Sequence, residues 1–273
     1  MLPDMMPIVI DLPREEIHIL PVADIHIGSK QFSQKRWDRF KEQAKGKYIV
    51  IVGDCIDNGV KHGSLGRTVY EQTMMPSAQK EWLYEELKPF AEDLDEYGNS
   101  RILCGVGGNH EKRSAESNDN PLYDVFCRLK EEWKYRESCA FCFLRINGKD
   151  RVKQGKYRPT YSVMVTHGSG GGQLIGAGLN KIQRFGGVVE GLDLMVSGHT
   201  HRPADFVSGR LYCDLHNKRI LERQFISVTA SSFLDFGGYP LDKLLIPTGH
   251  SFQEIVLSEH GKGIKVIQSM GGE

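Results

Sequence analysis

Residues 48–57 read Tyr-Ile-Val-Ile-Val-Gly-Asp-Cys-Ile-Asp, and this stretch indicates the fold class. Its first five residues are apolar, and such a continuous run is typical of a strand that is covered on both faces. Gly53 ends the run, and Asp54 and Asp57 follow it. Because ligands of α/β proteins bind beyond the carboxyl ends of strands, the stretch predicts a buried strand with a polar site at its end.

The same pattern recurs along the chain. Similar apolar runs that end in polar, glycine-containing clusters cover 17–22, 101–104, 161–165 and 192–196. Amphipathic stretches between them predict helices over 33–45, 77–97, 121–133 and 179–190. Asn120-Pro121 provides a cap and first-turn pair, and Pro89 should kink or end the helix that contains it. Later segments that indicate antiparallel sheet cover 219–228, 252–257 and 264–268.

These elements predict an α/β fold in which a two-sheet β-sandwich is flanked by helices. A chain of 273 residues with 40% hydrophobic content can bury one large core, so we expect a single domain over residues 1–273. Two insertions, at about 58–77 and 112–159, follow polar clusters at strand ends. We expect them to form walls on the rim of the site.

The charge balance excludes a global attraction to polyanions. Lys+Arg and Asp+Glu both number 35, so any attraction to nucleic acid must be local. No stretch approaches the roughly 18 apolar residues that span a bilayer, and no basic segment precedes an apolar run at the N-terminus. We therefore expect a cytoplasmic protein without a membrane partner.

The six cysteines lie mostly in apolar segments, and we interpret them as reduced thiols. Cys139-Ala-Phe-Cys142 has the spacing of half a zinc knuckle. No second pair accompanies it and it begins a strand-like run, so the pattern favours buried free cysteines.

Carboxylate, imidazole and amide groups follow the predicted strands. They lie in the segments Asp24–His26, Gly53–Asp57, Gly108–Glu111, Thr166–Gly168 and Gly198–His201. If the backbone stays extended, the alternating spacing of Asp24/His26 and of His199/His201 would send both side chains of each pair to one side. A single histidine is more often structural, but five of the ten histidines lie in these segments. Mixed oxygen and imidazole ligands suit manganese, iron or zinc.

Five segments over residues 24–201 resemble, in order, the signature of the calcineurin-like metallophosphoesterases. They are D-x-H, G-D-x-x-D, G-N-H-[D/E], a lone histidine and G-H-x-H. The resemblance implies two divalent ions, with manganese favoured over iron, zinc or nickel, bridged by Asp54. It implies that Asp24, His26, Asp54 and His201 bind the first ion. It implies that Asp54, Asn109, His167 and His199 bind the second. His110 would be the general acid, Asp57 would orient it, and Glu111 would lie behind the ligands.

The substrate is less well determined. Protein phosphatases of this family place arginines beside the second and third motifs, whereas this chain has Asn58-Gly59 and Val106-Gly107 there. This difference favours the phosphodiesterase or nuclease branch. The segment from Gln173 to Arg184 also resembles the corresponding loop of phage and prophage members, which points to nucleic acid or nucleotides.

Three segments offer substrate contacts. A basic hairpin over 145–158 could follow a nucleic-acid backbone or could simply be a solvated surface. The glycine-rich loop 168–172 could bring backbone N–H groups to phosphate oxygens or act as a lid. Lys181 and Arg184 could contact phosphate or belong to a charged helix surface.

Three functions remain open. The first is a phosphodiesterase that acts on DNA, RNA or a nucleotide through a hydroxide that bridges two metals. The second is a phosphomonoesterase, which needs a clamp for the terminal phosphate oxygens. The third is a non-catalytic interaction module. The sequence does not identify protein partners, and the segment from 241 onward could be a domain edge or a dimer contact.

Overall fold

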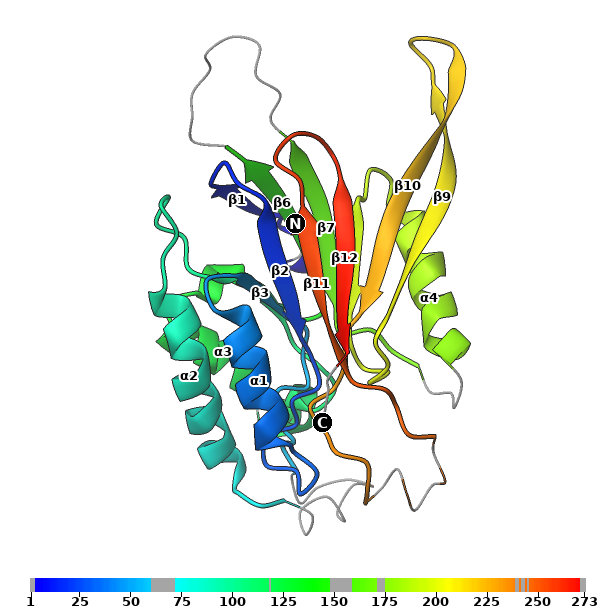
Figure 1. Cartoon of the computed structure of the whole chain (residues 1–273). Helices are drawn as coiled ribbons and strands as arrows, with labels where there is room; N and C mark the ends of the chain where they lie inside the picture. The colour runs from blue at the N-terminus through cyan, green and yellow to red at the C-terminus, as the bar shows by residue number, and fades with distance from the viewer. Residues whose placement is uncertain are drawn as a thin grey trace.

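Two six-stranded sheets lie face to face at the centre of the computed structural model, with helices on both outer surfaces (Figure 1). The structure describes residues 3–59, 72–117, 119–147, 159–170, 175–238, 241, 244 and 246–270. This architecture confirms the predicted α/β sandwich.

One sheet contains the first strands of the predicted pattern. Its order is β12-β11-β2-β3-β4-β5. The strands are β2 (Ile17–Val22), β3 (Tyr48–Ile51), β4 (Ile102–Val106), β5 (Tyr135–Arg136), β11 (Ser251–Leu257) and β12 (Ile264–Met270). The neighbours β2, β3, β4 and β5 are parallel, so their carboxyl ends lie at one edge of the sheet.

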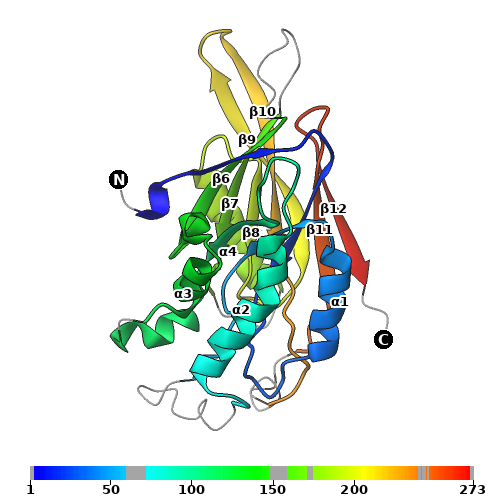
Figure 2. The ribbon, with the colours of Figure 1, turned by 90° about the vertical axis from the view of Figure 1, so that its left-hand side faces the viewer.

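The other sheet has the order β1-β6-β7-β8-β10-β9. Its strands are β1 (Ile8–Leu12), β6 (Cys139–Ile146), β7 (Thr160–Thr166), β8 (Leu194–Ser197), β9 (Ala204–Asp214) and β10 (Arg219–Thr229). Only Ile226 to Thr229 of β10 pair with β8. The rest of the β9–β10 hairpin therefore projects beyond the sheet (Figure 2).

Three helices cover the outer face of the first sheet, and one covers the second (Figures 1 and 2). They are α1 (Gln34–Ala44), α2 (Pro76–Glu92), α3 (Pro121–Arg128) and α4 (Ile175–Val188). Short 3-10 turns cover Pro3–Met5, Glu111–Ser117 and Glu132–Lys134. Apolar side chains fill the space between the sheets, as well as the spaces under α1 to α3 and under α4.

Helix bounds differ from the predicted ones where local signals compete. α2 ends at Glu92, three residues after Pro89, and not at residue 97. The Asn120 side chain accepts a hydrogen bond from the Tyr123 N–H, which confirms the predicted cap. The predicted helix over 121–133 ends at Arg128 and is followed by a 3-10 turn. Finally, α4 begins at Ile175, earlier than predicted.

Parts of the expected rim insertions contribute to the sheets. The 112–159 stretch includes β5 and β6, and β6 pairs with both β1 and β7. Residues 60–71 and 148–158, which include most of the basic hairpin, lie outside the described residues.

All six cysteines are free thiols. Cys139 and Cys142 are three residues apart in β6 and therefore face opposite sides of the strand, so they cannot share a metal ion. No helix in the described part of the chain is long and apolar enough to cross a membrane.

Candidate metal centre

Five strand ends from both sheets meet at one end of the sandwich. Asp24 and His26 follow β2, and Asp54 follows β3. Further ligand candidates after β4, β7 and β8 are Asn109, His110, His167, His199 and His201. The described residues form three groups of metal-ligating side chains at this edge, as the apolar runs and their polar ends predict.

The backbone at these ends is not extended, so the condition under which the alternating spacing would send both side chains of a pair to one side is not met. Left-handed φ angles occur at Asp24 (53°), His26 (51°), Asp54 (51°), His199 (68°) and His201 (57°). Such angles are uncommon for residues other than glycine and cost on the order of 1 kcal/mol or more each. Hydrogen bonds from the Asp24 N–H to the Gly53 carbonyl and from the His26 N–H to the Asp54 carbonyl, both 3.0 Å long, hold two of these loops together.

Asp24, His26 and His201 form the first group. His201 Nε2 lies 3.2 Å from Asp24 Oδ1 and 3.3 Å from His26 Nε2. Asp24 Oδ2 accepts the His199 N–H at 2.9 Å, but its buried Oδ1 has no hydrogen-bond partner among the described residues. A buried carboxylate oxygen without a donor, beside two ring nitrogens, fits a bound cation.

Asp54, Asn109, His167 and His199 form the second group. His167 Nε2 lies 3.2 Å from Asp54 Oδ2, 3.1 Å from Asn109 Oδ1 and 3.1 Å from His199 Nδ1. His167 Nδ1 donates to the Val52 carbonyl at 2.7 Å. This bond fixes the ring so that Nε2 faces the other ligands, as in histidines that bind metals.

Asp54 faces both groups. Its Oδ2, which is 3.2 Å from His167, also lies 4.0 Å from His26 Nε2 and 3.9 Å from His110 Nε2. Oδ1 accepts the His110 N–H at 2.8 Å. A Cβ at Gly108 would lie 2.1 Å from this oxygen, so only glycine fits there. The position of Asp54 is the one that a bridging ligand requires.

The charges of the site favour cation binding. Burial raises the pKa of Asp54, but its hydrogen bond and charge interaction with His167 outweigh burial and hold this pKa well below its usual range. Burial and the nearby His110 lower the pKa of His26 to about 4, so its ring is neutral at pH 7. Burial also lowers the pKa of His167, yet the bond to Asp54 raises it overall to about 9. A cation in the second group would displace this proton.

Glu111 joins two of the ligand loops from behind. Its Oε2 accepts the N–H groups of Asp54 at 2.9 Å and Gly108 at 2.8 Å. Its Oε1 accepts those of Cys55 at 2.7 Å and Ile56 at 3.4 Å. Burial and the Asp54 charge raise its pKa. Glu111 thus supports the ligands without joining them, in agreement with the predicted position.

The model of the calcineurin-like phosphoesterases matches residues 17–203 of the chain. The chain belongs to the calcineurin-like phosphoesterase family. This family typically binds two divalent metal ions, and the Asp and His groups described above fit that property.

Two further comparisons found more distant similarity. The DNA polymerase II small subunit of Archaeoglobus fulgidus is 30% identical over an alignment of 119 residues, and the match covers 38% of this chain and 22% of that protein. The chain therefore matches about a fifth of the length of this curated relative. A crystal structure of Vps29 from Chaetomium thermophilum covers 93% of this chain and 95% of its own, with 11% identity and a TM-score of 0.38.

His110 lies between the ligands and an arginine that sequence reasoning missed. Its Nδ1–H donates to the Asp57 carbonyl at 2.9 Å, and the Asp57 carboxylate lies 3.4 Å from the same atom. Arg113 donates from Nη2 to His110 Nε2 at 2.7 Å and from Nη1 to the Asp57 carbonyl at 2.8 Å. The chain has no arginine directly beside the second and third motifs, but the 3-10 turn after His110 brings Arg113 to the site.

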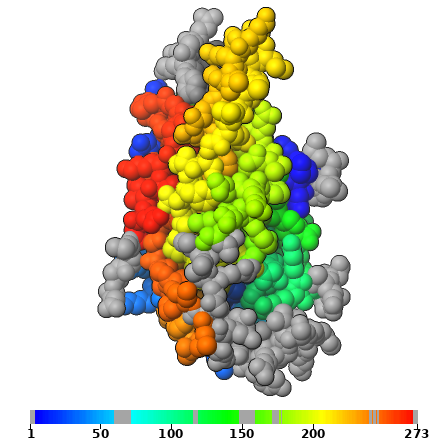
Figure 3. Space-filling model, turned by 90° about the vertical axis from the view of Figure 1, so that its right-hand side faces the viewer, coloured from blue at the N-terminus to red at the C-terminus, as the bar shows by residue number. Residues whose placement is uncertain are grey.

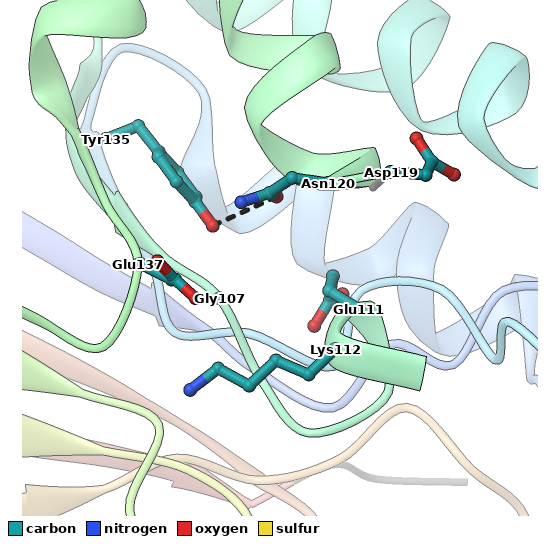
Figure 4. A pocket seen from close by; sticks show the side chains of 7 residues that line it. All are labelled: Gly107, Glu111, Lys112, Asp119, Asn120, Tyr135 and Glu137. Atoms are coloured by element: carbon teal, nitrogen blue, oxygen red, sulfur yellow. Dashed lines mark hydrogen bonds between the residues drawn. The ribbon is translucent and has the colours of Figure 1, made fainter. Parts of the chain in front are cut away.

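Two cavities adjoin the ligand loops. One of about 220 Å³ borders Glu111 and Lys112, and in it the Tyr135 hydroxyl donates to Asn120 Oδ1 at 3.1 Å (Figure 4). Another of about 450 Å³ is lined in part by Lys181 and Arg184. These two cations contact none of the expected ligands through any hydrogen bond or ion pair between described residues, so they lie beside the centre and not in it.

Proposed function

We propose that this phosphoesterase is a metal-dependent phosphodiesterase that cleaves a nucleotide or nucleic-acid ester by direct attack of water on phosphorus. The observation that supports the diester substrate is the cavity of about 450 Å³ that begins at Gly168, one residue after His167. A diester carries a second organic group that a monoester lacks. This cavity offers space for that group directly beside the expected ligands.

The proposed metal ligands are Asp24, His26, Asp54, Asn109, His167, His199 and His201. Two divalent ions held by them, with manganese favoured over iron, zinc or nickel, would neutralise the phosphate and lower the pKa of a bound water. The walls expected from residues 58–77 and 112–159 would limit access to this edge.

His110 is the proposed general acid. Its Nδ1 is fixed by the Asp57 carbonyl, so Nε2 is the atom that would carry a proton to the leaving oxygen. Arg113 donates to this Nε2 in the structure and would have to turn toward the phosphate when substrate binds. The guanidinium would then neutralise a non-bridging oxygen and leave Nε2 free to be protonated.

The test compares initial hydrolysis rates of matched nitrophenyl phosphate diester and monoester substrates. Metal-free protein is titrated with Mn²⁺, and an Asp54→Asn variant serves as the control. The proposal expects a metal-dependent rate that is higher on the diester and is lost in the variant. A higher monoester rate, or no metal-dependent rate on either substrate, would contradict it.

Arg113 also favours a second candidate, a phosphomonoesterase. A terminal phosphate has more charge to neutralise, and a guanidinium binds two of its oxygens at once. Under this alternative, Arg113→Lys would reduce the monoester rate much more than the diester rate. Equal effects on both substrates would remove the support for this candidate.

A further inference from the structure

We propose that the cavity beside α4 binds a nucleobase of the substrate, next to the phosphate that is cleaved. This inference rests on the proposed phosphodiesterase function and specifies the group on one side of the ester. The cavity lies between α4 and the ends of β7 and β8, on the face of the molecule seen in Figure 3.

The cavity and the metal centre share a wall. Gly168 lines the cavity, and a Cβ at this glycine would lie 3.6 Å from the Gly198 carbonyl oxygen and 3.9 Å from His199 Cβ. On the other side, a Cβ at Gly178 of α4 would lie 2.4 Å from Thr200 Cγ2. The helix therefore packs directly on the loop that carries His199, and Gly168, which lines the cavity, lies next to the same loop.

The lining combines an apolar floor with an exposed aromatic ring. Ile182 and Met195 are buried, whereas Phe185 is 52% exposed and Val188 is 79% exposed. Every nucleobase has a flat, largely apolar face, and stacking on an aromatic side chain binds bases of any sequence. Phe185 offers such a face within the cavity that Gly168 also lines.

The rim carries positive charge that is not neutralised. Lys181 lies over the glycine loop, with Nζ 3.3 Å from the position of a Cβ at Gly170. Neither Lys181 nor Arg184 forms an ion pair or hydrogen bond with any residue that the structure describes. Two cations above an apolar floor match a base with an attached phosphate.

The cavity in Figure 4 has the opposite charge. Glu111, Asp119 and Glu137 line it together with a single lysine, Lys112. Its net negative charge disfavours a phosphate, although it also borders a ligand loop. The two cavities therefore differ in the property that decides where an anionic nucleotide binds.

The experiment uses diester reporters that have the same leaving group. They are methyl nitrophenyl phosphate, dodecyl nitrophenyl phosphate, and the 5′- and 3′-nitrophenyl phosphate esters of thymidine. The readout is kcat/KM of each thymidine ester divided by kcat/KM of the methyl ester, at saturating Mn²⁺. Binding of thymidine monophosphate to the full chain is measured separately by calorimetry, which does not depend on turnover.

We expect the wild type to prefer at least one thymidine ester by about tenfold, in the range of base stacking on an aromatic ring. Phe185→Ala should reduce this preference about tenfold and weaken thymidine monophosphate binding to a similar extent. The matched control is Phe143→Ala, because Phe143 is also exposed, at 39%, but lies in β6 outside the cavity lining. This control should keep both properties.

Three results would overturn the inference. The first is equal rates on the thymidine and methyl esters, and the second is a preference that survives Phe185→Ala. The third is a stronger preference for the dodecyl ester, which would assign the apolar floor to an acyl chain. Metal-dependent hydrolysis of the methyl ester tests the proposed function itself, so failure of either idea is recognised independently. If no diester were cleaved, absent thymidine monophosphate binding would still refute the nucleobase site.

Discussion

Replacing Glu111 by glutamine should destabilise the fold, although the side chain barely changes in shape. Each carboxylate oxygen of Glu111 accepts two backbone N–H groups, and the side chain is 2% exposed. Glutamine keeps only one acceptor oxygen. Its NH₂ group must then face two backbone N–H donors, which leaves those donors buried and without a partner.

The cost follows from the hydrogen bonds that are lost. If the amide oxygen takes the place of Oε2, the bonds to Asp54 and Gly108 remain and those to Cys55 and Ile56 are lost. Hydrogen bonds to a charged group contribute about 1.5–3 kcal/mol each. The lost bonds are one strong bond, to Cys55, and one weak bond, to Ile56, and relief of repulsion with Asp54 offsets part of the loss. The free energy of unfolding should therefore fall by about 3 kcal/mol.

The assay is urea unfolding of the metal-free protein. With a slope of about 3 kcal/mol per molar urea, the midpoint of Glu111→Gln should fall by about 1 M. The control is Glu81→Gln, because Glu81 forms an exposed ion pair with Arg128 and its loss should leave the midpoint nearly unchanged. Equal midpoints for Glu111→Gln and wild type would refute the assigned role of this carboxylate.

Three further predictions concern His110, Arg113 and α4. His110→Ala should retain both metals, as measured by elemental analysis. Its turnover on alkyl esters should fall by a factor on the order of 10²–10⁴, whereas turnover on nitrophenyl esters should change much less. Unchanged turnover on alkyl esters would exclude His110 as the acid. Arg113→Met should lower kcat/KM by about tenfold or more, because a charge-assisted contact is lost, whereas the surface variant Arg128→Met should leave kcat/KM unchanged. Equal losses of kcat/KM in both variants would indicate a structural role only. Gly187→Ala, where no described residue outside the helix backbone lies within 4 Å of the new Cβ, should raise the free energy of unfolding by about 0.5–1 kcal/mol, whereas Gly178→Ala should lower it because of the clash with Thr200. Thermal denaturation measures both variants, and equal shifts would contradict the close packing of α4.

The local sequence was sufficient to predict the strands that carry the site. Each of β3, β4 and β8 is buried along its whole length, β2 and β7 are buried over most of theirs, and polar residues follow at each end. Their short length, β-branched residues and flanking glycines identify these runs as strands, because a continuous apolar run has no alternation to do so. The strand β9 was missed because most of its residues are partly or fully exposed and it contains no apolar run.

Other features depend on contacts between distant segments. Arg113 reaches His110 only because residues 111–117 form a 3-10 turn, and charge pattern alone does not indicate that turn. The left-handed backbone at Asp24 and Asp54 likewise depends on hydrogen bonds between two ligand loops. Sequence spacing therefore indicated which residues would meet, but it did not determine the backbone conformation at Asp24/His26 and His199/His201.

The strained backbone and the concentration of charge have a common explanation. Left-handed φ angles at five ligand residues cost free energy, as does burial of Asp24, Asp54 and Glu111 within one small volume. The β-branched strands and the packed sheets behind the site provide stability that keeps these loops in place. A bound cation would contact Asp24 Oδ1, which lies beside the ring nitrogens of His201 and His26, and would separate ring nitrogens that lie only 3.1 Å apart in the second group. Metal binding would therefore offset the concentrated negative charge and the crowded ring nitrogens, and the strained backbone holds those groups in place; this supports a centre built to hold ions over one built only to hold the loops together.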